Sequence, residues 1–253
     1  MAIHAEYTNV GKACRAVAEY AAEKNAGLHI HLSETENEHM ECIKRHGKTP
    51  ARFFADCGCF DVPVNAAHCV WVDDADIDLM ADKHVTAVYN PVSNLKLGSG
   101  VMPMKKLLEK GVRVALGTDG AASNNTLNIF KEMHIGAILQ KGISRDPSGI
   151  KACLLIEAAT VSGAAAQRRE KCGALSVGCC ADLILVDLDT LNNIPCYDLR
   201  HTAVYSAYAD NVVLTMIDGS ILYENGEFTT IDEEKLKYDM RNECGGYFKN
   251  KKQ

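Results

Sequence analysis

The stretch "HIHLSE", residues 29–34, carries both the first clear strand and the first candidate chemistry of the chain. With Leu28 before it, the segment reads as a short apolar strand, "LHIHL", that ends in a polar turn. Side chains alternate along a strand, so His29 and His31 lie on one face, and a His-x-His pair of this kind can hold a metal ion. Glu34 follows three residues later. The segment therefore predicts a strand with a metal site at its carboxyl end.

Three more apolar strands follow along the chain, and a helical segment comes after each of them. The strands are "NAAHCVWV" at 65–72, "TAVYNP" at 86–91 and "VRVALGTDG" at 112–120. Strands that alternate with helices predict parallel βαβ units. The length of 253 residues suits a complete (β/α)₈ barrel, yet four strand–helix units, preceded by one helix at 12–27, amount to half of one.

The last third of the chain has a different pattern. Residues 173–189 and 212–228 read as strand pairs around Gly and Asp turns, with "IDGS" and "ENGE" as hairpin signals. A helix that begins at "IDEEK" and a polar tail follow. The predicted organisation is half of a barrel over 1–170, strands of a small β-domain over 171–230, and a terminal helix with its tail over 231–253.

Composition and charge exclude several classes of protein. With 47% hydrophobic and 24% charged residues the chain is globular, and a net charge of −6 provides no basic surface for nucleic acid or anionic lipid. No apolar run approaches the length that spans a bilayer, and the N-terminus lacks a signal-peptide pattern, so a cytoplasmic protein is expected. Eleven scattered cysteines fit reduced thiols better than a disulfide framework.

Polar side chains stand at the carboxyl end of every predicted strand, where parallel α/β folds place their sites. The first strand ends at His31 with Glu34 beyond it, the second carries His68, the third ends at Asn90, and the fourth ends at Asp119. Turn formation alone explains an Asn or an Asp there, but not two histidines, a glutamate and an aspartate in succession. His31 and Asp119 are therefore candidate metal ligands.

Five blocks of the chain resemble the amidohydrolase superfamily, and within it the 5-methylthioadenosine/S-adenosylhomocysteine deaminase family. In the family's order and spacing, they are "HLSETENE", "AHCVWVDDADIDLMA", "NPVSNLKLGSGVMP", "LGTDGAASNNTLNIFKEM" and "GALSVGCCADLILVDLD". "IHAEYT" at 3–8 also resembles the family's "HAPYT" loop after the fourth strand. The resemblance covers nearly the whole chain. It implies an α/β fold, the C-terminal half of a metal-dependent-hydrolase TIM (β/α)₈ barrel with an appended small β-sandwich portion.

The resemblance also reassigns the opening stretch. In that family the metal-binding His-x-His pair ends the first barrel strand, whereas the interval from His31 to His68 matches the interval between the fifth and sixth strands. "HIHLSE" then looks like the fifth strand, with His31 as the ligand and His29 as a look-alike one layer deeper, where a packed, hydrogen-bonded histidine is expected. The first four strands, and with them the family's metal-binding pair, are implied to be absent from this chain.

The activity that the resemblance implies is hydrolytic deamination of an adenosine thioether to its inosine analogue and ammonia, with one divalent metal ion, Zn²⁺ in the first place, as cofactor. His31 and Asp119 are the implied metal ligands. In the implied mechanism Asp119 takes a proton from the attacking water, His68 orients the hydroxide, and Glu34 protonates the purine ring nitrogen.

Three residues are implied to contact the nucleoside: His4, Glu34 and Ser123. His4 belongs to the "HAEYT" loop, and Ser123 lies four residues after Asp119. Asn94, in the "NPVSN" block, is interpreted mainly as part of a structural turn under the site, because Asn-Pro and Ser-Asn are loop formers.

Two alternatives to a thioether deaminase remain open. A guanine deaminase or a triazine chlorohydrolase would share the metal blocks, although "TDGAASNN" and "HAEYT" favour the adenosine thioether branch. An inactive remnant that serves only as a packing unit is the other. The expected partners are a nucleoside substrate and either a missing N-terminal half or a second copy of the chain, with no nucleic acid or membrane.

Overall fold

The computed structural model describes residues 1–249, so the end of the predicted tail, residues 250–253, lies outside it. The strands are β1 (Ala2–Ile3), β2 (Leu28–Leu32), β3 (Val64–His68), β4 (Thr86–Tyr89), β5 (Arg113–Leu116), β6 (Leu183–Val186), β7 (Val212–Ile217), β8 (Ser220–Glu224) and β9 (Glu227–Phe228). The α-helices are α1 (Gly11–Glu23), α2 (Glu36–His46), α3 (Pro50–Asp56), α4 (Asp74–Asp82), α5 (Pro91–Lys96), α6 (Met104–Glu109), α7 (Ala121–Asn124), α8 (Ile129–Ser144), α9 (Ala152–Ala159), α10 (Val161–Ala166), α11 (Leu199–Tyr205) and α12 (Glu233–Lys249). Three short 3₁₀ helices complete the set, η1 (Glu6–Thr8), η2 (Cys59–Asp61) and η3 (Ala209–Asn211).

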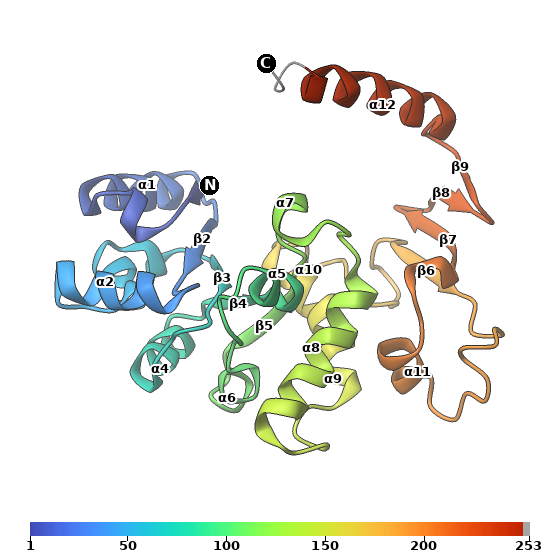
Figure 1. Ribbon diagram of the computed structural model, residues 1–253. Coiled ribbons are helices and arrows are strands. Elements are labelled where there is room, and N and C mark those ends of the chain that lie inside the picture. Colours follow the sequence, from blue (N-terminus) through green and yellow to red (C-terminus); the bar gives the residue numbers. More distant parts are fainter. Residues whose placement is uncertain (250–253) are drawn as a thin grey trace.

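The first five strands form one parallel sheet in the order β1-β2-β3-β4-β5, with helices packed on its outer side (Figure 1). The expectation of parallel βαβ units is confirmed. The expectation of four strands is wrong by one, because β1 adds a fifth. This strand pairs Ala2 with His29 and Ile3 with Ile30, so "LHIHL" is not an edge strand. Two residues are too few to show a periodic pattern, which is why the sequence alone did not reveal β1.

Alternation along the strands separates a helix-facing side from an inner side. On β2, Leu28 and Ile30 are buried in the hydrophobic core, while His29 and His31 face the opposite way. At the amino ends of the strands, the Asn65 side-chain amide donates to the Ala166 carbonyl at 2.9 Å, which ties β3 to the end of α10. The carboxyl ends carry the polar residues. Among the described residues the sheet stays open between β1 and β5, so closure into a barrel is not observed.

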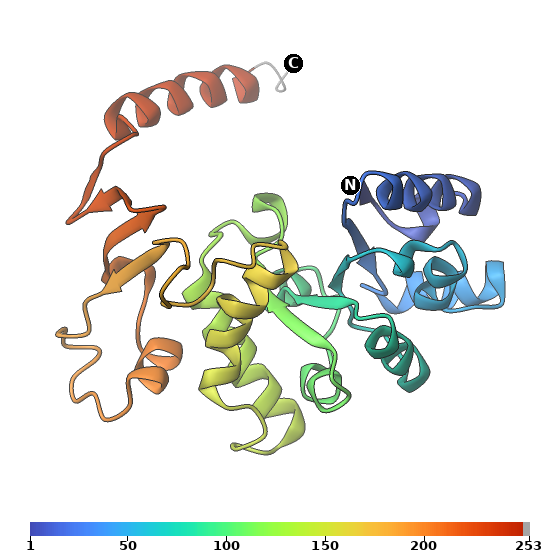
Figure 2. The same ribbon diagram turned by 180° about the vertical axis from the view of Figure 1, so that it is seen from behind.

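The C-terminal sheet is antiparallel, in the order β6-β7-β8-β9 (Figures 1 and 2). Its two hairpins turn at Asp218-Gly219 and Asn225-Gly226, all with positive φ, as the sequence predicted. Of the strand pair expected over 173–189, only β6 forms. Residues 173–182 are an irregular loop.

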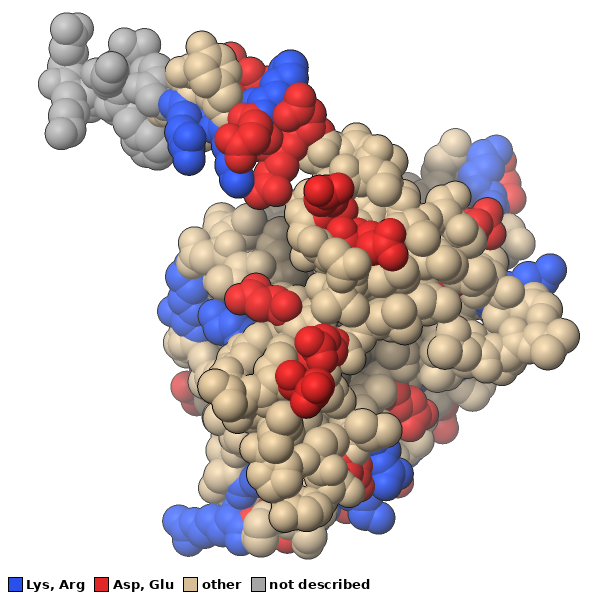
Figure 3. All heavy atoms as spheres, turned by 90° about the vertical axis from the view of Figure 1, so that its right-hand side faces the viewer, with Lys and Arg blue, Asp and Glu red and all other residues tan. Residues whose placement is uncertain are grey.

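The expected β-sandwich portion is not found within residues 1–249. The described residues supply one antiparallel layer, and the second layer that a sandwich needs does not come from this part of the chain. Apolar side chains of this layer are left exposed, including Ile184 at 47%, Leu185 at 52% and Ile217 at 41%. Uncharged residues dominate this side of the molecule (Figure 3).

Two helical predictions differ in outcome. The terminal helix expected after "IDEEK" forms as α12, and it stands apart from both sheets (Figures 1 and 2). The single helix expected over 148–168 is two helices, α9 and α10, that meet at Thr160, whose ψ of −87 departs from helical geometry. No helix within residues 1–249 combines the length and apolar character needed to cross a bilayer.

Candidate metal centre

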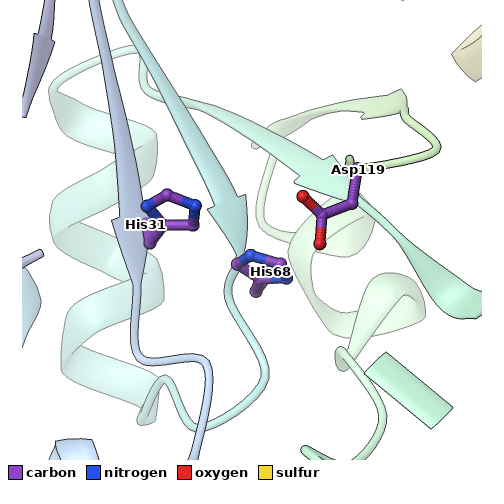
Figure 4. A group of neighbouring side chains, drawn as sticks. All are labelled: His31, His68 and Asp119. Carbon is purple, nitrogen blue, oxygen red and sulfur yellow. The ribbon is translucent and has the colours of Figure 1, made fainter. Parts of the chain in front are cut away.

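The candidate centre lies where the carboxyl ends of three parallel strands meet (Figure 4). His31 comes from β2, His68 is the last residue of β3, and Asp119 follows β5. His68 and Asp119 adopt positive φ values of 74° and 60°, a region that non-glycine residues enter at a cost of about 1–3 kcal/mol. Such backbone strain concentrates at functional sites, where it aims side chains that regular strands would turn away.

The His31 ring is held through one of its two nitrogens. Its Nδ1 lies 2.7 Å from the His4 carbonyl oxygen, which also accepts the His31 backbone amide at 3.0 Å. A carbonyl can only accept, so Nδ1 carries the proton and donates it. The lone pair is therefore on Nε2, which is the arrangement found in metal-binding histidines with an outer hydrogen-bond partner.

His68 is fixed in the same way but is fully enclosed. Its Nδ1 donates to the Asn94 side-chain oxygen at 2.8 Å, an assignment made from the amide orientation, and the residue is only 1% exposed. Its Nε2 lies 3.7 Å from Glu34 Oε2. The His31 and His68 rings are nearly parallel, with centroids 5.3 Å apart and an angle of 13° between their planes. Both imidazoles thus direct Nε2 away from their hydrogen-bonded sides.

Asp119 is held as a carboxylate. Burial alone raises the pKa of Asp119, but hydrogen bonds from Ser93, Ser123 and the Gly120 amide, together with His68, outweigh it and hold the pKa below the usual carboxyl value. The two hydroxyls donate to Oδ2 at 2.6 and 2.7 Å, and the amide donates to Oδ1 at 2.7 Å. The side chain is therefore negatively charged at neutral pH.

Ligand atoms of His31, His68 and Asp119 all lie within 4.8 Å of one another. Two imidazole nitrogens and one carboxylate are donors that Zn²⁺ and related divalent ions accept. Each donor also has the outer hydrogen-bond partner that orients metal ligands. The residues present therefore fit a divalent metal ion. Catalytic zinc sites use three or more protein ligands, so His31 and Asp119 alone would form part of such a ligand set.

Glu34 stands beside His31, His68 and Asp119 because the turn after β2 is held by hydrogen bonds to Glu38. The buried Glu38 carboxylate accepts the backbone amides of Ser33 and Glu34 at 3.1 and 2.7 Å, while Thr35 caps α2. The Glu34 carboxylate then accepts a hydrogen bond from the Ser99 hydroxyl at 3.2 Å. The turn thereby places Glu34 opposite His68.

The remaining predicted site residues lie around this group. The His4 ring meets the His31 ring edge-on at 4.9 Å, and its Nδ1 lies 2.9 Å from the Thr8 hydroxyl. Ser123 contacts Asp119 directly. Thus all the residues that the sequence singled out for the site, His4, His31, Glu34, His68, Asp119 and Ser123, are brought together.

His29 does not take the packed position expected for it. The residue is exposed on the inner face of the sheet, because nothing in residues 1–249 covers that face above it. Partial desolvation of its ring lowers the pKa of His29, and the neighbouring His31 and His68 lower this pKa further.

The sequence does not reveal the residues that orient the site. It favours a turn role for Asn94, yet Asn94 holds the His68 ring, and the adjacent Ser93 holds the Asp119 carboxylate. Buried Glu132 in turn accepts the Val92 amide at 3.1 Å and the Asn124 side chain at 2.5 Å, joining α5 to the loop after β5. The signal in the sequence was the pair of successive polar residues, Ser93 and Asn94, on a short helix that directly follows a strand.

A parallel α/β sheet with a histidine–aspartate metal site at the carboxyl ends of its strands defines a class of metal-dependent hydrolases. The Amidohydrolase family model matches residues 1–222 of the chain. The chain belongs to the amidohydrolase family.

Curated relatives narrow the comparison. The chain is 45% identical over 238 residues to the 5-methylthioadenosine/S-adenosylhomocysteine deaminase of Caldicellulosiruptor saccharolyticus, covering 94% of this chain and 56% of the relative. It is 44% identical over 225 residues to the 5'-deoxyadenosine deaminase of Methanosarcina acetivorans, covering 89% of this chain and 52% of the relative. The chain thus spans about half the length of the curated relatives it matches.

A solved structure agrees with the fold. The chain superposes with a TM-score of 0.92 on an adenosine deaminase from Xanthomonas campestris crystallised with bound zinc, at 32% identity. The match covers 95% of this chain and 55% of that structure.

Proposed function

We propose that the chain is the metal-site half of a hydrolytic deaminase acting on an adenosine derivative, 5-methylthioadenosine or S-adenosylhomocysteine. The observation that carries this proposal is the convergence of His31, His68 and Asp119 within 4.8 Å, with Glu34 beside His68. Deaminase relatives of this substrate class, identical at about 45% over nearly the whole chain, support it.

The metal would be held by His31 and Asp119, next to His68. A divalent ion such as Zn²⁺, when bound, supplies a water that ionises near neutral pH. Zinc in the Xanthomonas campestris structure supports that choice of ion.

The chain's own residues then manage protons. The Asp119 carboxylate, kept ionised by its three hydrogen bonds, accepts a proton from the attacking water at a carboxylate oxygen. His68, fixed through Nδ1, orients that water with Nε2. Glu34, in its protonated form, donates a proton to the purine ring nitrogen as water adds at C6. The proton taken by Asp119 leaves with ammonia, and the C6 hydroxyl returns a proton to Glu34 as the C6 carbonyl of the inosine product forms. One water is consumed for each ammonia released.

Substrate contacts are proposed for the rim of the same site. His4 carries a ring steadied by the Thr8 hydroxyl and would meet the purine nucleoside. Ser123 lies on the loop after β5 and would contact the substrate beside Asp119. Glu34 would serve both substrate binding and proton transfer.

The assembly around this site is proposed to need a partner. The proposed division is a half-barrel over 1–170, β-strands over 171–230 and a terminal segment from 231. Exposed apolar residues such as Ile184 and Leu185 lie in the C-terminal sheet. A cavity of about 570 Å³ between the two sheets is lined by Leu116, Ile129, Leu175 and Ile184, among others. We expect the missing N-terminal half, or a second copy of the chain, to cover these surfaces.

Ammonia release tests the proposal. The purified chain with added Zn²⁺ should release no measurable ammonia from 5-methylthioadenosine or S-adenosylhomocysteine. Mixing or co-expressing it with the N-terminal half of the Caldicellulosiruptor saccharolyticus relative should restore release, whereas the same mixture made with His31→Ala should stay inactive. Turnover by the chain alone within tenfold of the full-length relative would contradict the need for a partner. Release from guanine in place of the adenosine derivatives would contradict the substrate class.

A further inference from the structure

A buried ion pair links the His4 loop to helix α2. The Glu6 side chain, in η1, is 0% exposed, and its Oε1 lies 2.5 Å from an Arg45 guanidinium nitrogen. Its second oxygen, Oε2, has no hydrogen-bond partner among residues 1–249 and lies 3.7 Å from His46 Nε2. Because a buried carboxylate is costly and an apolar pair of similar size is often as stable, the contact calls for a role beyond stability.

The loop that Glu6 anchors is also held by buried Ala5 and by the packing of η1 on α2 and α3. β1 before it is only two residues long. The hydrogen bonds of Thr8 and Asn9 with the Ala5 backbone are made within the loop itself. Where the loop leaves β1, the long-range tie that matters to the site runs from His31 to the His4 carbonyl oxygen.

That carbonyl decides which nitrogen of His31 carries the proton. Any drift of the loop away from α2 moves the acceptor from Nδ1 of His31, and the ring loses its single orientation. The His4 ring, which lies 4.9 Å from the His31 ring, moves with the same backbone. The position of one loop thus controls a metal ligand and the proposed substrate contact together.

We infer that Glu6 is a positioning residue: through Arg45 it clamps residues 4–9 onto α2, and the clamped His4 carbonyl presets His31 for metal binding. The inference rests on the metal site of the proposed function. Beyond that function, the inference assigns control of the His31 ring orientation and tautomer to the Glu6–Arg45 ion pair, which lies outside the proposed metal and substrate contacts. Glu6→Gln keeps the side-chain volume and removes only the charge that pairs with Arg45.

The first measurement needs no metal. With nine histidines in the chain, ¹⁵N-detected ring correlations at pH 8 can report the tautomer of His31, assigned with His31→Ala. The unchanged protein should show His31 protonated at Nδ1 alone, and Glu6→Gln should show a mixture of both tautomers. Arg45→Lys, which keeps the charge without the planar fork, should fall between them.

The second measurement is Co²⁺ binding, followed by its visible spectrum. Glu6→Gln should raise the Co²⁺ dissociation constant about tenfold, the lower end of the loss typical when an outer partner of a metal-binding histidine is removed. Asp76→Asn is the matched control, because Asp76 is also a 0% exposed carboxylate paired with a half-exposed arginine, Arg52, and it does not touch the His4 loop. The control should lower the melting temperature and leave both the tautomer and Co²⁺ affinity unchanged.

The outcomes separate this inference from the proposed function. A single Nδ1-protonated tautomer of His31 in folded Glu6→Gln would overturn the role of Glu6, whatever the metal data show. An equal loss of Co²⁺ affinity in Asp76→Asn would also overturn it, by reducing the effect to general destabilisation. Failure of the unchanged chain to bind Co²⁺ at any concentration would count against the proposed metal site, while the tautomer result still decides on Glu6.

Discussion

Replacing Asn94 with alanine should damage the site without touching a proposed metal ligand. Asn94 and His68 are both buried, at 0% and 1% exposure, and the 2.8 Å hydrogen bond between them orients the His68 ring. Alanine removes the acceptor and leaves the Nδ1–H of His68 without a partner inside the protein. Water cannot replace the bond readily at such burial.

The size of the effect follows from the two ends of the Asn94 amide. An unsatisfied buried donor costs about 1–3 kcal/mol. Part of this cost is recovered, because Asn94 Nδ2 is itself buried without a hydrogen-bond partner in the part of the chain that the structure describes, and the mutation removes it. A net loss of about 1–2 kcal/mol lowers the melting temperature by roughly 2–8 °C for a chain of this size. A hydrogen bond worth about 1 kcal/mol also favours one His68 tautomer roughly fivefold, and that preference should vanish.

Thermal melts and ¹⁵N ring correlations of the histidines measure both effects at pH 8, where imidazoles of ordinary pKa are neutral. Asn193→Ala is the matched control, because Asn193 is 3% exposed and donates through Nδ2 to the Thr190 hydroxyl at 2.8 Å. Its buried Oδ1 has no hydrogen-bond partner among the described residues, and the residue belongs to a segment distant in sequence from the site. The control should lose stability to a similar degree and keep the His68 tautomer. If Asn94→Ala kept His68 protonated at Nδ1 alone, the assigned role of Asn94 would be wrong.

Three further predictions concern the site. Ser93→Ala should raise the pKa of Asp119 toward the usual carboxyl value, as a ¹³C NMR titration would show, and an unchanged Asp119 titration would contradict this. A lowered folded-state pKa stabilises the protein above the unfolded pKa, and this stability is lost as pH falls through the folded-state pKa, so the variant should unfold at a higher pH than the unchanged protein on acidification. In the protein assembled with the N-terminal half of the Caldicellulosiruptor saccharolyticus relative, His31→Ala should lose bound metal and His29→Asn should keep it, as metal analysis would show. The reverse result would shift the strand register by two residues. Glu34→Gln in the same protein should retain metal and lose about 10²–10⁴-fold in rate, and loss of metal instead would make Glu34 a ligand.

The assembly prediction is tested separately by light scattering. On its own, the chain should form dimers or larger species, because within residues 1–249 the edges of the parallel sheet and the apolar C-terminal layer are uncovered. A monodisperse monomer with one cooperative melt would contradict it.

The amino-acid sequence by itself determined the parallel α/β layout and the candidates for chemistry. Apolar strands followed by helices are set by neighbours along the chain, and the period of two on "LHIHL" is enough to place His29 and His31 on one face. The same local logic placed the turns Asp218-Gly219 and Asn225-Gly226, whose positive φ values favour these residue types.

Tertiary structure alone decided which groups act on which. The bonds from His68 to Asn94 and from Ser93 to Asp119 each join residues 26 positions apart, and Glu6 meets Arg45 across 39 positions. No periodicity in the sequence encodes such distances, because they depend on how successive strands and helices stack. The same holds for His29 and for the single layer of β6–β9. Exposure is a property of what packs against a surface rather than of the surface itself.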